Sequence, residues 1–424
     1  MRLSVRPSRL RGQVAVPGSK SHTIRAAAIA SLAEGESTIR APLDSQDTRA
    51  AVACYRALGA EIDTTGSDAW RVRGVAGRPR TPHDVVNVSN SGTTLRMAVS
   101  SAALLPEGLA VFTGDEQIRR RPIGPLLAAL ERLGAHARST RSNGCAPVVI
   151  GPRMVGGQTT IEAVTSQFLS SLLINCPLAE RDTEITVTVL NEAPYVHLTL
   201  GWLDAQGIAY ERRALEWFGI KGGQRYGGFE RRIPADFSSA TFFLCAAAIA
   251  DADVTLVGLD MNDPQGDKAV VDYLRAMGAT TEIASDGIRV ARGDLKGIEI
   301  DLNATPDALP AMAVVGCFAR GTTRLINVPQ ARLKETDRIH VMATELGKLG
   351  ARCKELPDGL IVQESKLKGG RVSGQDDHRV VMALSLAGLA GSEPVTIDTA
   401  EAINVTFPQY VDLMRSIGAD MQIT

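Results

Sequence analysis

The segment ALGAEI, residues 57–62, decides the fold, because its pattern returns five more times along the chain. In each copy a helical stretch ends at a glycine and a strand-like run begins. A glycine just past a helix suits the left-handed conformation that closes a helix C-terminus. The copies recur about every 70 residues, which indicates an internal structural repeat. The six glycines are Gly59, Gly134, Gly207, Gly278, Gly350 and Gly418.

Each repeat has the same internal order. An Ala-rich helical run is followed by a Thr/Val-rich strand such as TEITVTVL from Thr183, then by a second helix that ends at the glycine, then by more strand. This order predicts a βαβαββ module. Six modules predict an α/β protein of two similar lobes with three modules each. The Ala-rich runs span residues 21–32, 91–104, 166–178, 238–249, 307–318 and 378–389.

The length also favours two lobes, because 424 residues are too many for one hydrophobic core. A seam at residues 231–236 lies halfway along the chain, where the fourth module starts. We expect one lobe formed by residues 1–16 plus 235–424, with both termini and modules four to six. Residues 17–234 would form the inserted lobe, with modules one to three.

Composition excludes several classes of function. The net charge of −1 provides no global field for nucleic acid or an anionic membrane. The longest apolar stretches, such as residues 241–250, are shorter than a membrane span, and no apolar run follows the basic N-terminus. The six cysteines and six histidines are dispersed without metal-type spacing. We therefore expect a cytoplasmic protein without a metal site.

Basic residues stand at the starts of several Ala-rich helices. A helix N-terminus carries positive partial charge, so a cation there is unfavourable unless an anion is near. The Ser, Thr, Asn and Asp residues at these positions are explained as N-caps, but the cations are not. Equivalent helix starts in repeated modules point the same way, so we expect an anion-binding site. The cations in question are Lys20, Arg25, Arg96 and Arg379.

Two segments carry most of the chemical signal. In PGSKSHTIR, residues 17–25, Arg25 follows Ser21 by four residues and would share its helix face. In RLKETDR, residues 332–338, Lys334 and Arg338 have the same spacing, and Glu335 stands between them. A glutamate flanked by cations suits a proton donor or acceptor in a closed site. A capped, solvated helix remains the alternative for either segment taken alone.

In combination these motifs resemble the 5-enolpyruvylshikimate-3-phosphate synthase family. PGSKSHTIR, NSGTTLR, RRRPIG, TSQF, PDA, RLKETDR, DDHR and TFP occur in the family's order from Pro17 to Pro408. The resemblance implies the enolpyruvyl transferase fold, an inside-out α/β barrel whose lobes close over the substrates. It also implies transfer of the enolpyruvyl group of phosphoenolpyruvate to the 5-hydroxyl of shikimate-3-phosphate, in the shikimate pathway to chorismate and the aromatic amino acids.

The resemblance also implies residue roles. Asp307 would be the base, Glu335 the acid that protonates the enol carbon, and Lys20 and His378 would lie beside this chemistry. Inhibition by glyphosate is expected, with Gly92 as the small residue associated with it. The shikimate-3-phosphate site would comprise Lys20, Ser21, Arg25, Thr165, Ser166, Gln167, Tyr195, Asp307, Gln330 and Lys334. The phosphoenolpyruvate site would comprise Lys20, Asn90, Gly92, Arg121, Gln167, Arg338 and Arg379.

The implied reaction explains the number of cations. Two multiply charged anions must be brought together, and arginine binds carboxylate and phosphate in bidentate fashion. No metal or organic cofactor is needed. The expected partners are these two small molecules, without nucleic acid or membrane, and the expected state is a monomer.

Two positions depart from the family pattern. Glu192 stands in EAPY where the family often has Ser-Lys-Pro-Tyr, and Val405 precedes TFP where many members have Lys. A UDP-N-acetylglucosamine enolpyruvyl transferase is the nearest alternative, but residues 113–121 lack the cysteine that it usually carries. A non-catalytic anion-binding repeat scaffold is the other alternative. Phosphate release from phosphoenolpyruvate plus shikimate-3-phosphate would decide among the three.

Overall fold

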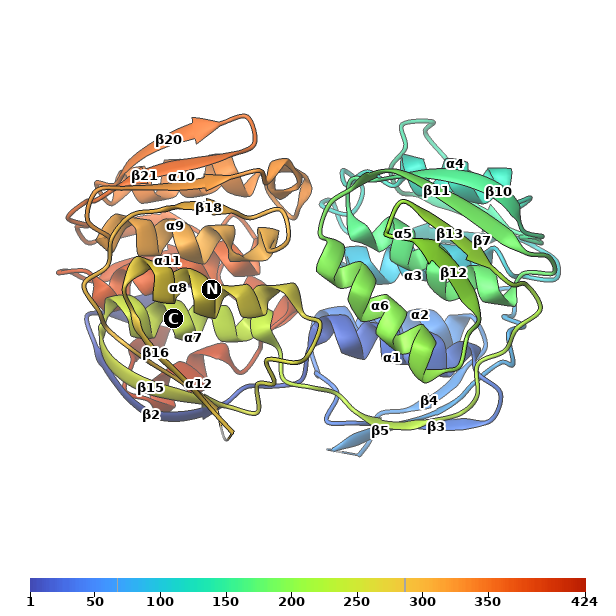
Figure 1. Cartoon of the computed structure of the whole chain (residues 1–424), viewed down its shortest axis with the longest axis horizontal. Helices are drawn as coiled ribbons and strands as arrows, with labels where there is room; N and C mark the ends of the chain where they lie inside the picture. The colour runs from blue at the N-terminus through green and yellow to red at the C-terminus, as the bar shows by residue number, and fades with distance from the viewer. Residues whose placement is uncertain (67, 286) are drawn as a thin grey trace. The chain divides into compact units, whose positions relative to one another are not determined.

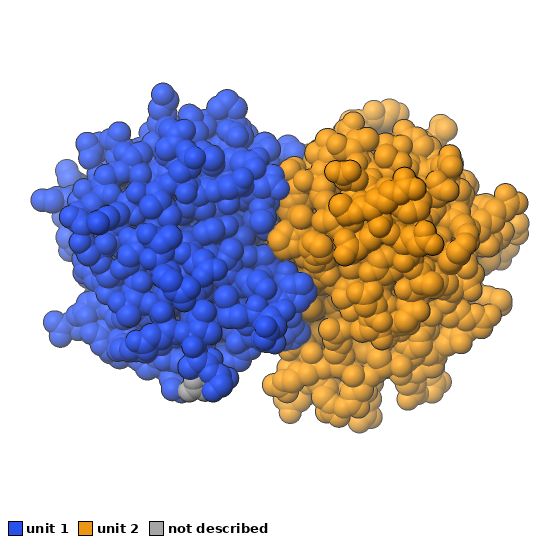
Figure 2. All heavy atoms as spheres, viewed as in Figure 1, with its two compact units in different colours: residues 1–17, 234–424 blue, residues 18–233 orange. Residues whose placement is uncertain are grey.

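A computed structural model describes residues 1–424 except 67 and 286. The chain divides into two compact units, coloured separately in Figure 2: unit 1 is Met1–Pro17 with Pro234–Thr424, and unit 2 is Gly18–Ile233. None of the described helices has the length and apolar character required to cross a membrane.

The described residues form six four-stranded sheets, one for each predicted module (Figure 1). In every sheet the first strand pairs in parallel with the second, and two antiparallel strands complete the other edge; these two form a hairpin in five sheets, whereas in the sixth they are β1 (Leu3–Arg6) and β24 (Asp420–Ile423) from the two ends of the chain. The βαβαββ prediction is therefore confirmed. The six repeat glycines all have left-handed φ angles, between 67° and 111°, as the helix-closing interpretation requires.

Unit 2 contains modules one to three, and a late strand, β14, completes the sheet of module one. Module one comprises β14 (Glu230–Arg232), α1 (Lys20–Leu32), β3 (Glu36–Arg40), α2 (Gln46–Ala57), β4 (Glu61–Asp63) and β5 (Ala69–Arg73). Module two comprises β6 (Val86–Asn87), α3 (Gly92–Ala102), β7 (Ala110–Thr113), α4 (Gly124–Arg132), β8 (His136–Ser139) and β9 (Val148–Gly151). Module three comprises β10 (Gly157–Ala163), α5 (Ser166–Asn175), a 3-10 turn (Cys176–Leu178), β11 (Thr183–Leu190), α6 (Ala193–Ala205), β12 (Tyr210–Arg213) and β13 (Trp217–Ile220).

Unit 1 contains modules four to six and takes two strands from the N-terminal segment. Module four comprises β2 (Arg9–Ala15), α7 (Phe237–Ile249), β15 (Asp251–Val257), a 3-10 turn (Gly266–Lys268), α8 (Ala269–Met277), β16 (Thr280–Ala284) and β17 (Gly287–Ala291). Module five comprises β18 (Glu299–Asp301), a 3-10 turn (Pro306–Ala308), α9 (Leu309–Phe318), β19 (Thr322–Ile326), a 3-10 turn (Pro329–Leu333), α10 (Arg338–Lys348), β20 (Arg352–Leu356) and β21 (Gly359–Gln363). Module six comprises β22 (Gly370–Ser373), α11 (His378–Ala390), β23 (Val395–Asp398), a 3-10 turn (Ala400–Val405), α12 (Tyr410–Ser416), β24 (Asp420–Ile423) and β1 (Leu3–Arg6).

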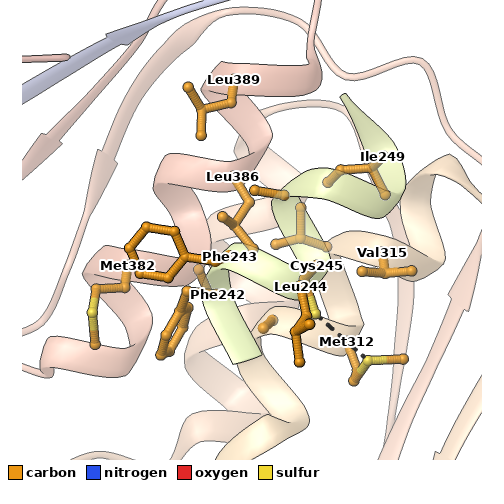
Figure 3. Close-up of a cluster of buried hydrophobic side chains, with 14 of the residues drawn as sticks. Phe242, Phe243, Leu244, Cys245, Ile249, Met312, Val315, Met382, Leu386 and Leu389 are labelled. Carbon is orange, nitrogen blue, oxygen red and sulfur yellow. Dashed lines mark hydrogen bonds between the residues drawn. The ribbon is translucent and has the colours of Figure 1, made fainter. Parts of the chain in front are cut away.

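The Ala-rich helices form the centre of each unit. In unit 1, helices α7, α9 and α11 pack against one another, and every residue of α7 is buried. Figure 3 shows Phe242, Leu244, Met312 and Leu386 of these helices in one apolar cluster. Small alanine side chains allow close helix approach, and a helix that is apolar all round is stable only when buried. The second helices, such as α8, bury one face only. This core fixes where the starts of the central helices lie.

Candidate active site

The start of α1 in unit 2 holds the first candidate cation. Lys20 is the first helical residue, its side chain is 16% exposed, and its Nζ lies 3.0 Å from Oδ2 of Asp47. Asp47 stands in the first turn of α2, and its main-chain oxygen accepts a hydrogen bond from Thr94 of α3 at 3.4 Å. Three helix starts are thus adjacent, and within the protein a carboxylate already balances Lys20.

Arg25 occupies a buried position one turn further along α1. Its side chain is 1% exposed and donates to Oγ1 of Thr199 at 2.8 Å and to the main-chain oxygens of Ser21 and Tyr195 at 3.0 and 3.2 Å. The predicted shared face of Ser21 and Arg25 is confirmed. Burial lowers the pKa of Arg25 to about 10, with Tyr195 and Glu192 opposing the shift. Arg25 therefore ties α1 to α6 and fixes the position of the main chain at Tyr195.

The start of α3 is packed tightly against two arginines. Ser91 is the N-cap of α3, and Gly92 is its first residue. A Cβ added to Gly92 would lie 2.7 Å from Nη1 of Arg96 and 2.8 Å from Cζ of Arg121. Asn90 donates to carboxylate and amide oxygens of the 115–117 segment at 2.6 and 2.7 Å. Glycine is therefore what lets both guanidinium groups approach the helix start.

The start of α5 carries the TSQ segment. Thr165 is the N-cap, and Oε1 of Gln167 accepts a hydrogen bond from Nη1 of Arg96 at 2.7 Å, so the starts of α3 and α5 are linked. Glu192 is 2% exposed, and its Oε2 accepts from Ser166 N at 3.1 Å, Ser166 Oγ at 2.8 Å and Thr165 Oγ1 at 3.1 Å. A carboxylate thus already occupies one helix start at which the sequence predicts a bound anion.

In unit 1 the candidate residues surround one guanidinium. Arg338, the first residue of α10, is buried and donates from Nη1 to Asp307 and from Nη2 to Glu335, each at 2.7 Å. Its Nε and Nη2 also bind both carboxylate oxygens of Asp377, at 2.8 and 3.1 Å. Burial alone would lower the pKa of Arg338, but Asp377, Glu335 and Asp307 raise it well above its ordinary value. The candidate acid and the candidate base therefore share a cation.

Two further cations contact Asp307. Nη2 of Arg379 lies 2.9 Å from Oδ2, and Nζ of Lys334 lies 3.9 Å from Oδ1. The prediction that Lys334 and Arg338 share a helix face is wrong, because α10 begins only at Arg338 and Lys334 has extended backbone angles after a 3-10 turn. The N-cap Asp337 stops the helix from extending backwards, since its side chain accepts from His340 N. The two cations converge through packing instead.

The remaining predicted residues of unit 1 lie near this cluster. Gln330 is 3% exposed and donates from Nε2 to Asn303 O at 3.0 Å; within the described residues its buried Oε1 has no hydrogen-bond partner. Such an acceptor suits a ligand hydroxyl. His378 is 2% exposed, with Nδ1 4.0 Å from Oδ1 of Asp377.

Three carboxylates were missing from the sequence-based site. Asp47 binds Lys20, Asp377 binds Arg338, and Asp267 is 1% exposed and accepts a hydrogen bond from Ser238. Burial first, and then the charge of Asp307, raise the pKa of Asp267 to about 6, although Arg379 and the Ser238 hydroxyl oppose the shift. The signal for both Asp47 and Asp377 was their place at helix starts, but N-capping explains Asp377 equally well, and the helix dipole favours an acidic residue in the first turn, where Asp47 stands.

The chain matches a known protein family over nearly its whole length. Residues 5–414 match the family model described as EPSP synthase (3-phosphoshikimate 1-carboxyvinyltransferase). Proteins named 3-phosphoshikimate 1-carboxyvinyltransferase from Acetivibrio thermocellus and Ruminiclostridium cellulolyticum are 56% and 53% identical. The first alignment covers 99% of both chains, and the second covers 100% of both.

Solved structures show the same fold. The EPSP synthase of Acinetobacter baumannii superposes with a TM-score of 0.82 at 28% identity, covering 100% of each chain. The enolpyruvyl transferase NikO of Streptomyces tendae superposes with a TM-score of 0.80 at 19% identity, covering 100% of this chain and 98% of that one, and this likeness concerns the fold alone. The two lobes of three modules predicted from the repeat, and the enolpyruvyl transferase fold implied by the family resemblance, are therefore confirmed, and the chain belongs to the EPSP synthase family.

Proposed function

We propose that the chain is a 3-phosphoshikimate 1-carboxyvinyltransferase, the activity named for its full-length relatives. The 5-hydroxyl of shikimate-3-phosphate adds to the central carbon of phosphoenolpyruvate, whose terminal carbon takes a proton. The resulting methyl group then loses a proton and the central carbon loses inorganic phosphate, which restores the double bond. The products are the enolpyruvyl ether and phosphate, so no oxidant or reductant is involved.

The observation that carries this proposal is the shared contact of Asp307 and Glu335 with Arg338. The two carboxylates come from separate segments of the chain, yet each is 2.7 Å from a nitrogen of the same guanidinium. Addition needs one group to remove a proton from oxygen and another to deliver one to carbon. We assign removal to Asp307, which lies within 3.9 Å of three cationic side chains, and delivery to Glu335.

Anion binding is assigned to cations and hydrogen-bond donors of each unit. Arg338 and Arg379 of unit 1 would exchange their present carboxylate partners for the substrate anions. His378 and Lys20 are proposed to position the reacting groups. For shikimate-3-phosphate the proposed residues are Lys20, Ser21, Arg25, Thr165, Ser166, Gln167, Tyr195, Asp307, Gln330 and Lys334. For phosphoenolpyruvate they are Lys20, Asn90, Gly92, Arg121, Gln167, Arg338 and Arg379.

The state of the enzyme is also part of the proposal. The enzyme is proposed to be a cytoplasmic monomer that uses no metal or organic cofactor. Light scattering after size exclusion measures the mass directly, and a single peak at about the 45.0 kDa of one chain is expected. A peak at the mass of a dimer would refute the monomer but would not bear on the proposed reaction.

The test is phosphate release from phosphoenolpyruvate plus shikimate-3-phosphate. Wild type is expected to release phosphate, and Asp307→Asn and Glu335→Gln to lose about 10²–10⁴-fold in kcat. Glu299→Gln is a matched control, because Glu299 is exposed on β18 and binds Arg324. Release with UDP-N-acetylglucosamine as the acceptor, or no release with either acceptor, would contradict the proposal.

Deuterated water separates the two carboxylate roles. If Glu335 delivers the proton to carbon, wild type incorporates deuterium into the methylene of the product, because the intermediate methyl group mixes solvent and substrate hydrogens. In single-turnover mixtures Glu335→Gln should accumulate little labelled material, whereas Asp307→Asn should impair attack by the hydroxyl. Undiminished labelling in Glu335→Gln would remove the acid role from Glu335.

A further inference from the structure

Glu192 occupies donors that the proposed function gives to a substrate. Its buried Oε2 accepts three hydrogen bonds, from the main chain and hydroxyl of Ser166 and from the hydroxyl of Thr165. A main-chain N–H at a helix start together with two hydroxyls is the donor set that binds a phosphate oxygen. The carboxylate therefore stands where the phosphate of shikimate-3-phosphate is proposed to bind.

The two anions cannot share this place. Each donor satisfies one acceptor well, and two like charges in contact inside a protein repel strongly. Burial of Glu192 to 2% exposure leaves little water to screen that repulsion. Binding of the phosphate therefore requires the carboxylate to leave the start of α5.

The backbone at Glu192 is compatible with such a movement. Its φ of 60° is left-handed, a conformation that is unfavourable for a glutamate, and at the N-cap of α6 its side chain makes no capping hydrogen bond. The side chain is instead directed to α5. Movement of Glu192 away from α5 would cost α6 no cap and would allow the backbone to relax.

We propose that Glu192 is a specificity-determining residue that acts as an internal substitute for the substrate phosphate. In the free enzyme its carboxylate holds Thr165 and Ser166 in their binding geometry. The phosphate of shikimate-3-phosphate binds by displacing it, so the apparent affinity is reduced by the fraction of molecules in which the donors are occupied. The inference rests on the proposed function.

The proposal makes a prediction that depends on the phosphate. Glu192→Ser removes the carboxylate, so shikimate-3-phosphate should bind about tenfold more tightly. Shikimate, which lacks the phosphate, should gain little. The measured quantity is the dissociation constant of shikimate divided by that of shikimate-3-phosphate, and this ratio should rise. Both constants are obtained by calorimetry on the full chain. Glu192→Gln, which keeps the shape and removes the charge, should change the ratio in the same direction and serves if Glu192→Ser does not fold.

Glu184→Gln is the charge control, because Glu184 is exposed on strand β11 and accepts a hydrogen bond from Gln158 of β10. It should leave the ratio unchanged, which excludes a general effect of net charge. An unchanged or reduced ratio in both Glu192 variants would overturn the inference and identify Glu192 as a structural anchor of α5. Phosphate release by wild type, measured in parallel, separates this failure from failure of the proposed function.

Discussion

Replacing Asp267 by Asn is expected to change how stability depends on pH. Asp267 is buried beside α7, and its carboxylate accepts a hydrogen bond from Ser238. Burial, together with the charge of Asp307, raises its pKa from 3.8 to about 6. Asparagine keeps an oxygen for the Ser238 hydroxyl and cannot ionise. The variant therefore removes one buried charge at neutral pH while retaining the volume of the side chain.

The magnitude follows from the pKa difference. A raised carboxyl pKa means that the folded chain binds a proton more tightly than the unfolded chain. Between pH 3.8 and about 6 the unfolded state ionises first, so the free energy of unfolding falls as the pH rises. The full loss is about 3 kcal/mol above pH 6, and somewhat less than half of it develops between pH 5 and pH 7. The stability of Asp267→Asn relative to wild type should rise by this amount.

Denaturant unfolding at pH 5, 6, 7 and 8 measures the effect, with the difference between variant and wild type taken at each pH so that other titrating groups cancel. Asp272→Asn is the matched control, because Asp272 lies on α8 with a side chain that is 63% exposed. The difference in the free energy of unfolding between Asp272→Asn and wild type should not change from pH 5 to pH 8. The raised pKa would be refuted if the free energy of unfolding of Asp267→Asn, relative to wild type, stayed constant or fell as the pH rises.

Two further substitutions test the site. Arg338→Met leaves Asp307, Glu335 and Asp377 without their shared cation and should cost about 3–5 kcal/mol of stability, against less than about 1 kcal/mol for Arg324→Met at an exposed pair; equal losses in denaturant unfolding would contradict the buried cluster. Gly92→Ala places a Cβ within 2.8 Å of the Arg96 and Arg121 guanidinium groups, so the KM for phosphoenolpyruvate and the inhibition constant for glyphosate should each rise about tenfold. Gly201→Ala, where an added Cβ meets nothing within 4 Å, should leave both constants unchanged, and inhibition constants that match in wild type and Gly92→Ala would refute the argument.

The sequence was sufficient for the repeat and for most helix starts because these depend on local rules. A glycine just past a helix readily adopts the left-handed conformation that closes the helix, and all six repeat glycines have that conformation. Ser91, Thr165 and Asp377 were recognisable as helix caps from residue type alone, and their side chains do accept main-chain hydrogen bonds at the starts of α3, α5 and α11.

The balance of charge at those helix starts was decided only by tertiary structure. From the sequence, cations at helix starts indicated that a ligand supplies the negative charge, whereas Asp47 and Asp307 supply it for Lys20 and Arg379 within the protein. The sequence also could not show that Glu192 takes the place of a bound anion, because this depends on a contact between residues 26 positions apart. Residue spacing along the chain determines which groups share a helix face, but only packing of the central helices determines which opposite charges come within a few ångströms.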